Sequence, residues 1–383
     1  MKPDRITLLV FIDWFFPGYK GGGPIESCKN LVESLITDYN IYVVTRDVDF
    51  GDRKPYANIE SNVWLTLPSG VKVKYLSEKN LTLSTIFAVV REVSPNHIYL
   101  NSMFSRFFSI YPLLLNFFGV TGKAIQITLA PRGMLLASAL SKKKMKKEFF
   151  LRLSKFLYSK KNVRFHATNE AEKQAVALMY PGNRIFVANN LPFFGQLPYV
   201  GIQKRKGELR LLYLARIDPI KNLILLIKIL KQVRENVLLT IAGPVEDRVY
   251  WEECLQEMRA LPPNAKVEII GPVPKEQVGN IILDHHLYVL LTQGENFGHT
   301  IFEALVNGRP VLISDQTPWQ KLETLGIGLS ARLEDHANIM EYICRAIDWD
   351  QEEYDVCSRK TWKYAHDYLH GDLNRALYLE IFV

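Results

Sequence analysis

Hydrophobic and polar positions along the chain follow two different periods, which predicts β-strands that alternate with helices. In the first half, short apolar runs predict strands at 6–12, 41–45, 71–75, 97–101, 123–130 and 163–168. Apolar residues at helical spacing occupy several of the gaps, at 25–35, 82–93 and 136–160. Such alternation is typical of a parallel sheet covered by helices on both faces.

The same alternation restarts near residue 207 and is more regular there. Strands are predicted at 209–215, 237–243, 266–271, 286–292 and 310–314. Helices are predicted at 222–234, 248–260, 275–283 and 299–308. The stretch 351–383 reads as helical, without a strand. Between the two halves the periodicity lapses in NNLPFFGQLPYVGIQKRKG, which predicts an interdomain linker.

Length and composition agree with two domains. The chain has 383 residues, of which 48% are hydrophobic and 23% charged. A typical domain has roughly 150–200 residues, so each half can bury its own core. Disordered, fibrous and coiled-coil proteins are excluded. The pattern predicts two doubly wound α/β domains with Rossmann-like parallel sheets, and ligands of such sheets bind in crevices at the strand ends.

The cysteines and the longest apolar runs indicate in which cellular compartment the protein is expected. Four cysteines lie far apart without metal-ligand spacing, which predicts free thiols in a reducing environment. The apolar run near the N-terminus is short and is closed by Asp13. No apolar run reaches the roughly 20 residues of a spanning helix. We expect a cytoplasmic protein.

Charge is distributed unevenly between the halves. Residues 1–200 carry 26 Lys+Arg against 14 Asp+Glu (26 − 14 = +12), and residues 201–383 carry 21 against 26 (21 − 26 = −5). A one-sided field predicts an anionic partner for the first half. The lysines Lys143, Lys144 and Lys147 precede an apolar helical stripe in 149–157, which suits an anionic membrane surface and equally suits a core helix with a solvated flank. No nucleic-acid motif is present, so we expect no nucleic-acid partner.

The segment 294–315, GENFGHTIFEALVNGRPVLISD, contains the most informative motif. Gly294 and Gly298 bracket a turn between an apolar strand and a helix, whose first N–H groups can hold a phosphate. Glu295 in the turn and Glu303 on the helix can each accept hydrogen bonds from paired sugar hydroxyls. An isolated pair of glutamates is usually solvated, but the strand–turn–helix context favours a binding site.

Two further loops complete the candidate chemistry. In ARIDPIKN (215–222), Arg216 ends a strand and Lys221 follows a turn, so both cations can neutralise a diphosphate leaving group. In KGGGPIES (20–27), three glycines allow close approach of a ligand to the backbone. No GK[ST] follows them, which disfavours a Walker-type nucleotide hydrolase. Alone, the Arg216/Lys221 pair would more often be solvated surface, and the glycine run could equally be a flexible surface loop.

Together these motifs resemble glycosyltransferase family 4, retaining enzymes that use nucleotide-sugar donors and have the GT-B fold. GGGP, PRGM (131–134), HATNEAE (166–172) and the whole second half carry the resemblance. It implies an acceptor-binding domain at 1–190, a linker at 191–206 and a nucleotide-sugar-binding domain at 207–364. The last helix, 365–383, would pack back on the first domain.

The resemblance also implies roles for individual residues. Arg216 and Lys221 would bind the donor diphosphate, and Glu295 would hold the transferred sugar as a catalytic residue. Glu303 would bind the ribose hydroxyls, and Gly271 to Val273 would frame the base. The remaining implied donor contacts are Gly22, Gly23, Asn296, Phe297, Gly298, His299 and Thr300.

The implied reaction transfers a sugar from a UDP- or GDP-sugar to a glycan or lipid-linked glycan of a cell-surface polysaccharide. It needs no metal or other cofactor, because cations and a helix amino end stabilise the diphosphate. The chain has Arg132 in APRGM where many members have a histidine, so no catalytic base is assigned. Arg132 would bind donor or acceptor or form a structural salt bridge.

Two alternatives remain open, and a third is disfavoured. A GT-B sugar-nucleotide epimerase would need no glycan acceptor, and a basic membrane- or nucleic-acid-binding module would not respond to nucleotide sugars. The pairs Asp47/Asp49 and Asp348/Asp350 are reminiscent of metal-dependent GT-A transferases. A GT-A enzyme, however, would not explain the second set of alternating strands and helices.

Overall fold

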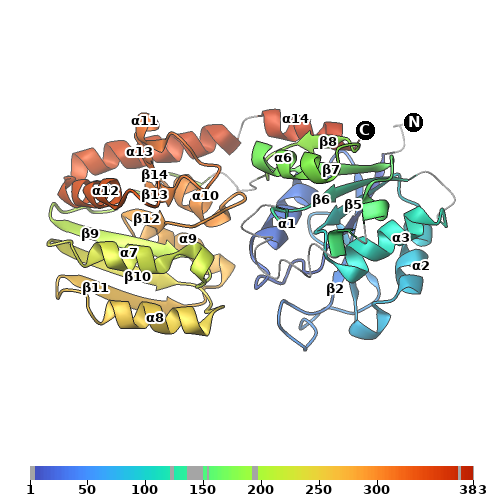
Figure 1. The fold of residues 1–383 in the computed structure, drawn as a ribbon, viewed down its shortest axis with the longest axis horizontal. Helices are drawn as coiled ribbons and strands as arrows, with labels where there is room; N and C mark the ends of the chain where they lie inside the picture. The colour runs from blue at the N-terminus through green and yellow to red at the C-terminus, as the bar shows by residue number, and fades with distance from the viewer. Residues whose placement is uncertain are drawn as a thin grey trace. The chain divides into compact units, whose positions relative to one another are not determined.

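The computed structural model describes residues 5–120, 125–135, 150–152, 155–191, 197–369 and 372–382. The chain divides into two compact units (Figure 1). Unit 1 consists of Met1–Phe193 together with Asp372–Val383, and unit 2 consists of Phe194–Gly371. The C-terminal segment, predicted as one helix from residue 365, therefore belongs to both units.

Unit 1 is built on an eight-stranded sheet of order β3-β4-β2-β1-β5-β6-β7-β8. All neighbours are parallel except β3 with β4, so the expectation of a purely parallel sheet is wrong at this edge. The strands are β1 (Thr7–Phe11), β2 (Asn40–Arg46), β3 (Trp64–Thr66), β4 (Lys72–Leu76), β5 (His97–Asn101), β6 (Gln126–Ala130), β7 (Val163–Ala167) and β8 (Ile185–Val187). The helices are α1 (Gly23–Leu35), α2 (Leu83–Val93), α3 (Tyr111–Phe117), α6 (Glu170–Met179) and α14 (Asp372–Ile381).

The two faces of this sheet bury different side chains because successive residues of a strand point in opposite directions. In β1, Leu9 and Phe11 belong to the core cluster that includes residues of α2, α3 and α6. Leu8 and Val10 belong to the cluster that includes residues of α1 and α14, among them Tyr378. The last helix is thus part of the core of unit 1.

Unit 2 contains a six-stranded, fully parallel sheet of order β11-β10-β9-β12-β13-β14. Its strands are β9 (Glu208–Leu214), β10 (Asn236–Ala242), β11 (Ala265–Gly271), β12 (Leu287–Leu290), β13 (Val311–Ser314) and β14 (Gly328–Ala331). Its helices are α7 (Leu223–Leu230), α8 (Arg248–Met258), α9 (Lys275–Leu283), α10 (His299–Val306), α11 (Leu322–Leu325), α12 (His336–Asp348) and α13 (Gln351–Leu369). The predicted strands match β9 to β13, whereas the four-residue β14 and the helix α12 were not predicted.

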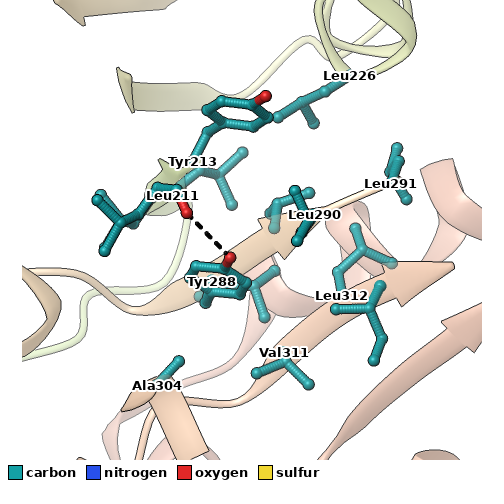
Figure 2. Packing of buried hydrophobic residues seen from close by; sticks show 14 of the residues in the cluster. Leu211, Tyr213, Leu226, Tyr288, Leu290, Leu291, Ala304, Val311 and Leu312 are labelled. Atoms are coloured by element: carbon teal, nitrogen blue, oxygen red, sulfur yellow. Dashed lines mark hydrogen bonds between the residues drawn. The ribbon is translucent and has the colours of Figure 1, made fainter. Parts of the chain in front are cut away.

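The helices of unit 2 cover the sheet on both faces. Helix α7 packs against α8 and α12, and α10 packs against α9 and α13. Apolar side chains of β9, β12, β13 and α10 meet in the core, where the Tyr288 hydroxyl also donates a hydrogen bond of 3.2 Å to the Leu214 carbonyl (Figure 2). The predicted doubly wound α/β class is confirmed for this unit.

The strand order of unit 2 has one reversal. The chain proceeds outward from β9 through β10 to β11, and then returns to the other side of β9 as β12 and continues to β14. The topological switch point therefore lies between β9 and β12, whose outgoing connections diverge at the carboxyl edge of the sheet. In the described part of the chain, no helix has the length and hydrophobicity that a membrane span needs.

Candidate active site

The loops after β9 and β12 leave the switch point of unit 2 side by side, because these strands pair through Leu287–Leu211 and Tyr288–Leu212. They are the two loops that contain the predicted motifs, 215–222 and 294–298. Parallel topology thus brings together segments about 75 residues apart in the sequence. This is the position at which open α/β sheets bind ligands.

The loop after β9 holds Lys221 in a short 3-10 turn, Pro219–Lys221. The buried carboxylate of Asp218 caps this turn by accepting hydrogen bonds from the backbone N–H groups of Ile220 (2.7 Å) and Lys221 (3.2 Å). Asp and Asn favour such caps because their short side chains reach the backbone two and three residues on. Sequence reasoning missed Asp218, although Asp-Pro is a recognisable turn signal.

Lys221 and Glu295 form an ion pair at the switch point. The Lys221 Nζ lies 2.6 Å from Glu295 Oε2, and the two side chains are 12% and 21% exposed. Buried Thr292 fastens the loops to each other, since its hydroxyl donates to the Ile220 carbonyl (3.0 Å). The structure therefore brings together two residues that the motifs had placed in one site, and Thr292 was not foreseen.

Helix α10 starts beside this ion pair. Its N-cap is Gly298 with φ 78°, and among the described residues no side chain caps this end. A Cβ at position 298 would lie 2.6 Å from Ile301 Cδ1 and 3.2 Å from Glu295 Cγ, so glycine is needed for both conformation and space. The amino end of α10 is thus a site of partial positive charge next to Lys221 and Glu295.

The turn that precedes α10 is rigidly held. Phe297 is buried, and its carbonyl accepts a hydrogen bond from the indole N–H of Trp319, which packs on the Phe297 ring at a centroid distance of 5.3 Å. The backbone N–H of Glu295 donates to the Gln316 carbonyl at 3.0 Å. Such fixed backbone supports a preorganised binding turn. Phe297 and Gly298 are therefore buried parts of the turn, and Asn296 is half-buried.

Glu303 lies one turn further along α10 and is buried, with 6% of its side chain exposed. It pairs with Lys275, the first residue of α9, which is 39% exposed. A buried carboxylate needs such a partner. Lys275 was missed by sequence reasoning, although it is the first residue of the helix predicted at 275–283.

Arg216 has a partner of its own. Its guanidinium lies 2.5 Å from Glu246 Oε1 in the loop after β10, and both side chains are about half-exposed. This loop approaches Arg216 because Gly243 (φ 138°) packs on the backbone after β9, where a Cβ would lie 2.0 Å from the Ala215 oxygen. Arg216 and Lys221 thus share a loop but are paired with different carboxylates.

The other predicted donor residues of unit 2 lie on the same edge of the sheet. Gly271 ends β11 and its carbonyl accepts from the Gly243 N–H at 2.8 Å, while Val273 packs against the core. His299 and Thr300 are half-buried in the first turn of α10. Thr300 Oγ1 lies 2.7 Å from the Tyr288 hydroxyl. Burial raises the pKa of Tyr288, and the nearby carboxylates of the site raise it further, so this hydroxyl keeps its proton.

The predicted residues of unit 1 occupy the carboxyl edge of its own sheet. Gly22 (φ 68°) and Gly23 start α1, and their contact with a donor phosphate stays a prediction. Arg132 follows β6 and donates to Oδ1 of Asn101 (3.0 and 3.2 Å), to the Tyr99 hydroxyl (3.1 Å) and to Oδ1 of Asn190. Its bonded acceptors among the described residues are neutral, so the interpretation as a salt bridge is wrong. Lys143, Lys144 and Lys147 lie outside the described residues.

The aspartate pairs have structural roles. Asp49 is buried and accepts backbone hydrogen bonds from Tyr19 (2.9 Å) and Lys20 (3.2 Å), and Asp47 accepts from the Ser61 hydroxyl at 2.7 Å. Asp350 accepts from the Glu353 N–H at 2.9 Å. In the described ranges no group of three or more His, Cys, Asp or Glu side chains could hold a metal ion.

Comparison with known proteins agrees with this geometry. Residues 201–361, nearly all of unit 2, match the family model of "Glycosyl transferases group 1". A search of curated protein sequences gives no significant match.

Solved structures resemble the whole chain. Sucrose-phosphate synthase from Thermosynechococcus elongatus matches with a TM-score of 0.70 at 14% identity, over 99% of each chain. Anabaena HepE in complex with UDP and glucose matches with a TM-score of 0.67 at 14% identity, over 98% of each chain. WaaG, a glycosyltransferase involved in lipopolysaccharide biosynthesis, matches with a TM-score of 0.67 at 12% identity, over 97% of this chain and 98% of its own.

These matches define the class of protein. The two parallel-sheet α/β units have the GT-B fold, as predicted. Unit 2 carries a glycosyltransferase group 1 domain, and the chain is an enzyme of the glycosyltransferase class. Membership of family 4 in particular stays a prediction.

Proposed function

We propose that the protein is a retaining glycosyltransferase that transfers a sugar from a UDP- or GDP-sugar to a glycan or lipid-linked glycan in cell-surface polysaccharide synthesis. The observation that carries the proposal is the Lys221–Glu295 ion pair at the switch point, directly beside the uncapped amino end of α10. HepE, one of the similar structures, was solved with UDP-glucose, and WaaG acts in lipopolysaccharide biosynthesis.

The charges of the site suit a nucleotide diphosphate. Lys221 and the amino end of α10 offer positive charge to the diphosphate, and Arg216 adds a second cation from the same loop. Glu295 and Glu303 lie within one short segment, where the first would accept hydrogen bonds from the transferred sugar and the second from the ribose. Because protein groups supply this positive charge, the proposed reaction requires no divalent metal.

The proposed step exchanges one bond at the anomeric carbon. The bond from C1 of the sugar to the diphosphate oxygen breaks, and a bond from C1 to the acceptor oxygen forms on the same face. The acceptor proton passes to a diphosphate oxygen. Lys221, Arg216 and α10 stabilise the negative charge that grows on the departing diphosphate, which is where electrostatic catalysis is strongest.

The test starts with a donor screen. A ligand that binds only the folded state raises the melting temperature, so UDP- and GDP-sugars are screened by thermal shift. The selected donor is then incubated with glycan and lipid-linked acceptors, and NMR determines the anomeric configuration of the product. Retention of configuration supports the proposal. Inversion, or rapid conversion of the donor without any acceptor as in an epimerase, contradicts it.

We further propose that unit 1 contacts an anionic membrane that carries the acceptor. Phe118 and Phe156 are 70% and 52% exposed, and both rings pack on Phe117 at centroid distances of 5.3 and 5.0 Å. Lys160 lies 4.5 Å above the Phe117 ring, and Lys155 and Lys161 flank it in sequence. Exposed aromatic residues beside lysines suit a lipid interface. Buried Leu151 and Leu157 show that other apolar positions of this segment pack in the core.

Vesicle sedimentation tests this surface. Phe118→Asp with Phe156→Asp should abolish binding to vesicles rich in phosphatidylglycerol. Leu178→Asp, at a position 87% exposed on α6, is the matched control and should bind like the unmodified protein. Equal binding of all three proteins would exclude the aromatic surface as the contact.

A further inference from the structure

A polar cavity lies at the opposite edge of the unit 2 sheet from the donor loops. It has a volume of about 530 Å³ and is formed where β9, β10 and β11 begin. The distance between the cavity and the candidate active site can be judged along β9. Arg210, near the start of this strand, lines the cavity, and Arg216 follows its other end. Six residues of strand span roughly 20 Å. The cavity is therefore separate from the candidate active site.

Three cations line this cavity: Arg205, Arg210 and Lys266. Arg210 and Lys266 lie in one row across the sheet, since Leu238 pairs with Arg210 on one side and with Lys266 on the other. Among the described residues, none of the three has a carboxylate within 4.0 Å. Glu208 is the one acidic residue of the lining, so the lining has a net charge of +2 (3 − 1).

The buried residue His286 leaves Arg210 without an acceptor. The ring Nδ1 accepts a hydrogen bond from the Arg210 backbone N–H at 3.1 Å, so this nitrogen carries no proton. Burial lowers the pKa of His286 to about 4, and a neutral ring then carries its proton on Nε2, which donates to the Gln203 carbonyl at 2.9 Å. Nε2 therefore cannot accept from the Arg210 guanidinium 3.3 Å away. In the described chain this guanidinium has no oxygen acceptor.

The lining also offers neutral polar groups beside the cations. Asn264 donates its amide to the carbonyls of Val233 (3.0 Å) and Glu235 (2.8 Å), which leaves its Oδ1 to accept from a ligand. Asn236 lies beside it at the start of β10. Between the lining residues Gln203 and Arg205, buried Lys204 fixes the backbone, because its ammonium donates to the carbonyls of Arg205, Ile347 and Trp349, each at 2.9 Å.

From these groups we infer that the amino-edge cavity of unit 2 binds a small phosphorylated sugar. The phosphate would lie against Arg210, Lys266 and Arg205, because charge-assisted hydrogen bonds to a phosphate satisfy the guanidinium that lacks an acceptor. The sugar hydroxyls would donate to the amide oxygens of Asn236 and Asn264. The volume is in the range of small-molecule sites, about 300–1,000 Å³. This inference does not depend on the proposed transferase reaction.

Calorimetric titration with glucose 6-phosphate tests the inference, with saturating UDP present to occupy the donor site. We expect binding that is weakened at least about tenfold by Arg210→Gln combined with Lys266→Gln. Glu208→Gln removes the opposing charge and should tighten binding several-fold. Lys363→Gln, at an exposed position of α13, is the control that should leave the affinity unchanged.

The outcomes separate clearly. Absence of binding, or binding that Arg210→Gln/Lys266→Gln leaves unchanged, overturns the inference. Inorganic phosphate that binds as tightly as glucose 6-phosphate overturns its sugar component. Circular dichroism and the melting temperature without ligand verify that each variant is folded, so that loss of binding is not loss of structure. A failed donor screen with intact glucose 6-phosphate binding would contradict only the proposed transferase function.

Discussion

The Lys221–Glu295 ion pair allows the sharpest test of the active-site assignment. Lys221→Gln removes a cation whose Nζ lies 2.6 Å from Glu295 Oε2 in a site where both side chains are mostly buried. The relevant interaction is between the Lys221 ammonium and the charge on the departing diphosphate. Two such unit charges about 4 Å apart, at an effective dielectric constant of about 20, interact by roughly 4 kcal/mol. At about 1.36 kcal/mol per decade, this corresponds to about 1,000-fold in rate.

Only the part of this energy that appears in the transition state accelerates the reaction. Because Glu295 already balances Lys221 before the diphosphate departs, we expect kcat for sugar transfer to fall by about 100- to 1,000-fold. The effect on stability should be small, about 1 kcal/mol or less, since the ion pair is not fully buried. For a domain of this size that lowers the melting temperature by about 2–4 °C.

The assay follows nucleotide release and product formation with the donor that the thermal-shift screen selects. Lys231→Gln is the matched control, because it removes a lysine from another Lys–Glu pair of unit 2, with Glu257. It should change stability similarly and activity little. The exchange Lys221→Glu/Glu295→Lys restores opposite charges and should recover the melting temperature without the activity. Activity of Lys221→Gln within threefold of the unmodified enzyme, or its recovery in the exchanged variant, would refute the reasoning.

Four further predictions concern the donor, the turn, the metal and pH. Glu303→Gln should raise the donor KM by about 10- to 100-fold with kcat nearly unchanged, because one charged hydrogen bond is lost, and steady-state kinetics measures this. Gly298→Ala should destabilise the fold by about 1–2 kcal/mol in urea unfolding because φ is 78°, whereas Gly279→Ala in open space on α9 should not. EDTA should leave transfer unchanged, and a metal-dependent activity would contradict the proposed chemistry. Burial lowers the pKa of His166 from 6.5 to about 3, so its contribution to stability is complete above pH 6.5 and is lost between pH 6.5 and about 3, at about 1.4 kcal/mol per pH unit. His166→Gln should make the free energy of unfolding depend less on pH below 6.5. Equal pH dependence in the variant and the unmodified protein would disprove this role of His166.

The strand–helix alternation and the site motifs could be predicted from the sequence because both are local. Apolar runs predicted β9 to β13 to within two residues at each end, since buried parallel strands consist of continuous apolar residues. The strand β14 was not predicted because its four residues, GLSA, do not form a continuous apolar run. The antiparallel edge strand β3 is even shorter.

Partners across the fold could not be predicted, because they depend on strand order. Strand order alone places Lys221 beside Glu295, and Lys275 beside Glu303. It also places the Arg210 guanidinium beside a neutral His286.

By itself the sequence determined two doubly wound units and the residues of the donor loops, because local periodicity and turn chemistry encode them. Only the tertiary structure decided which carboxylate neutralises which cation. These choices arise where strands distant in sequence pair through backbone hydrogen bonds. No local pattern of side chains specifies that order, because every strand presents the same backbone groups to its neighbours.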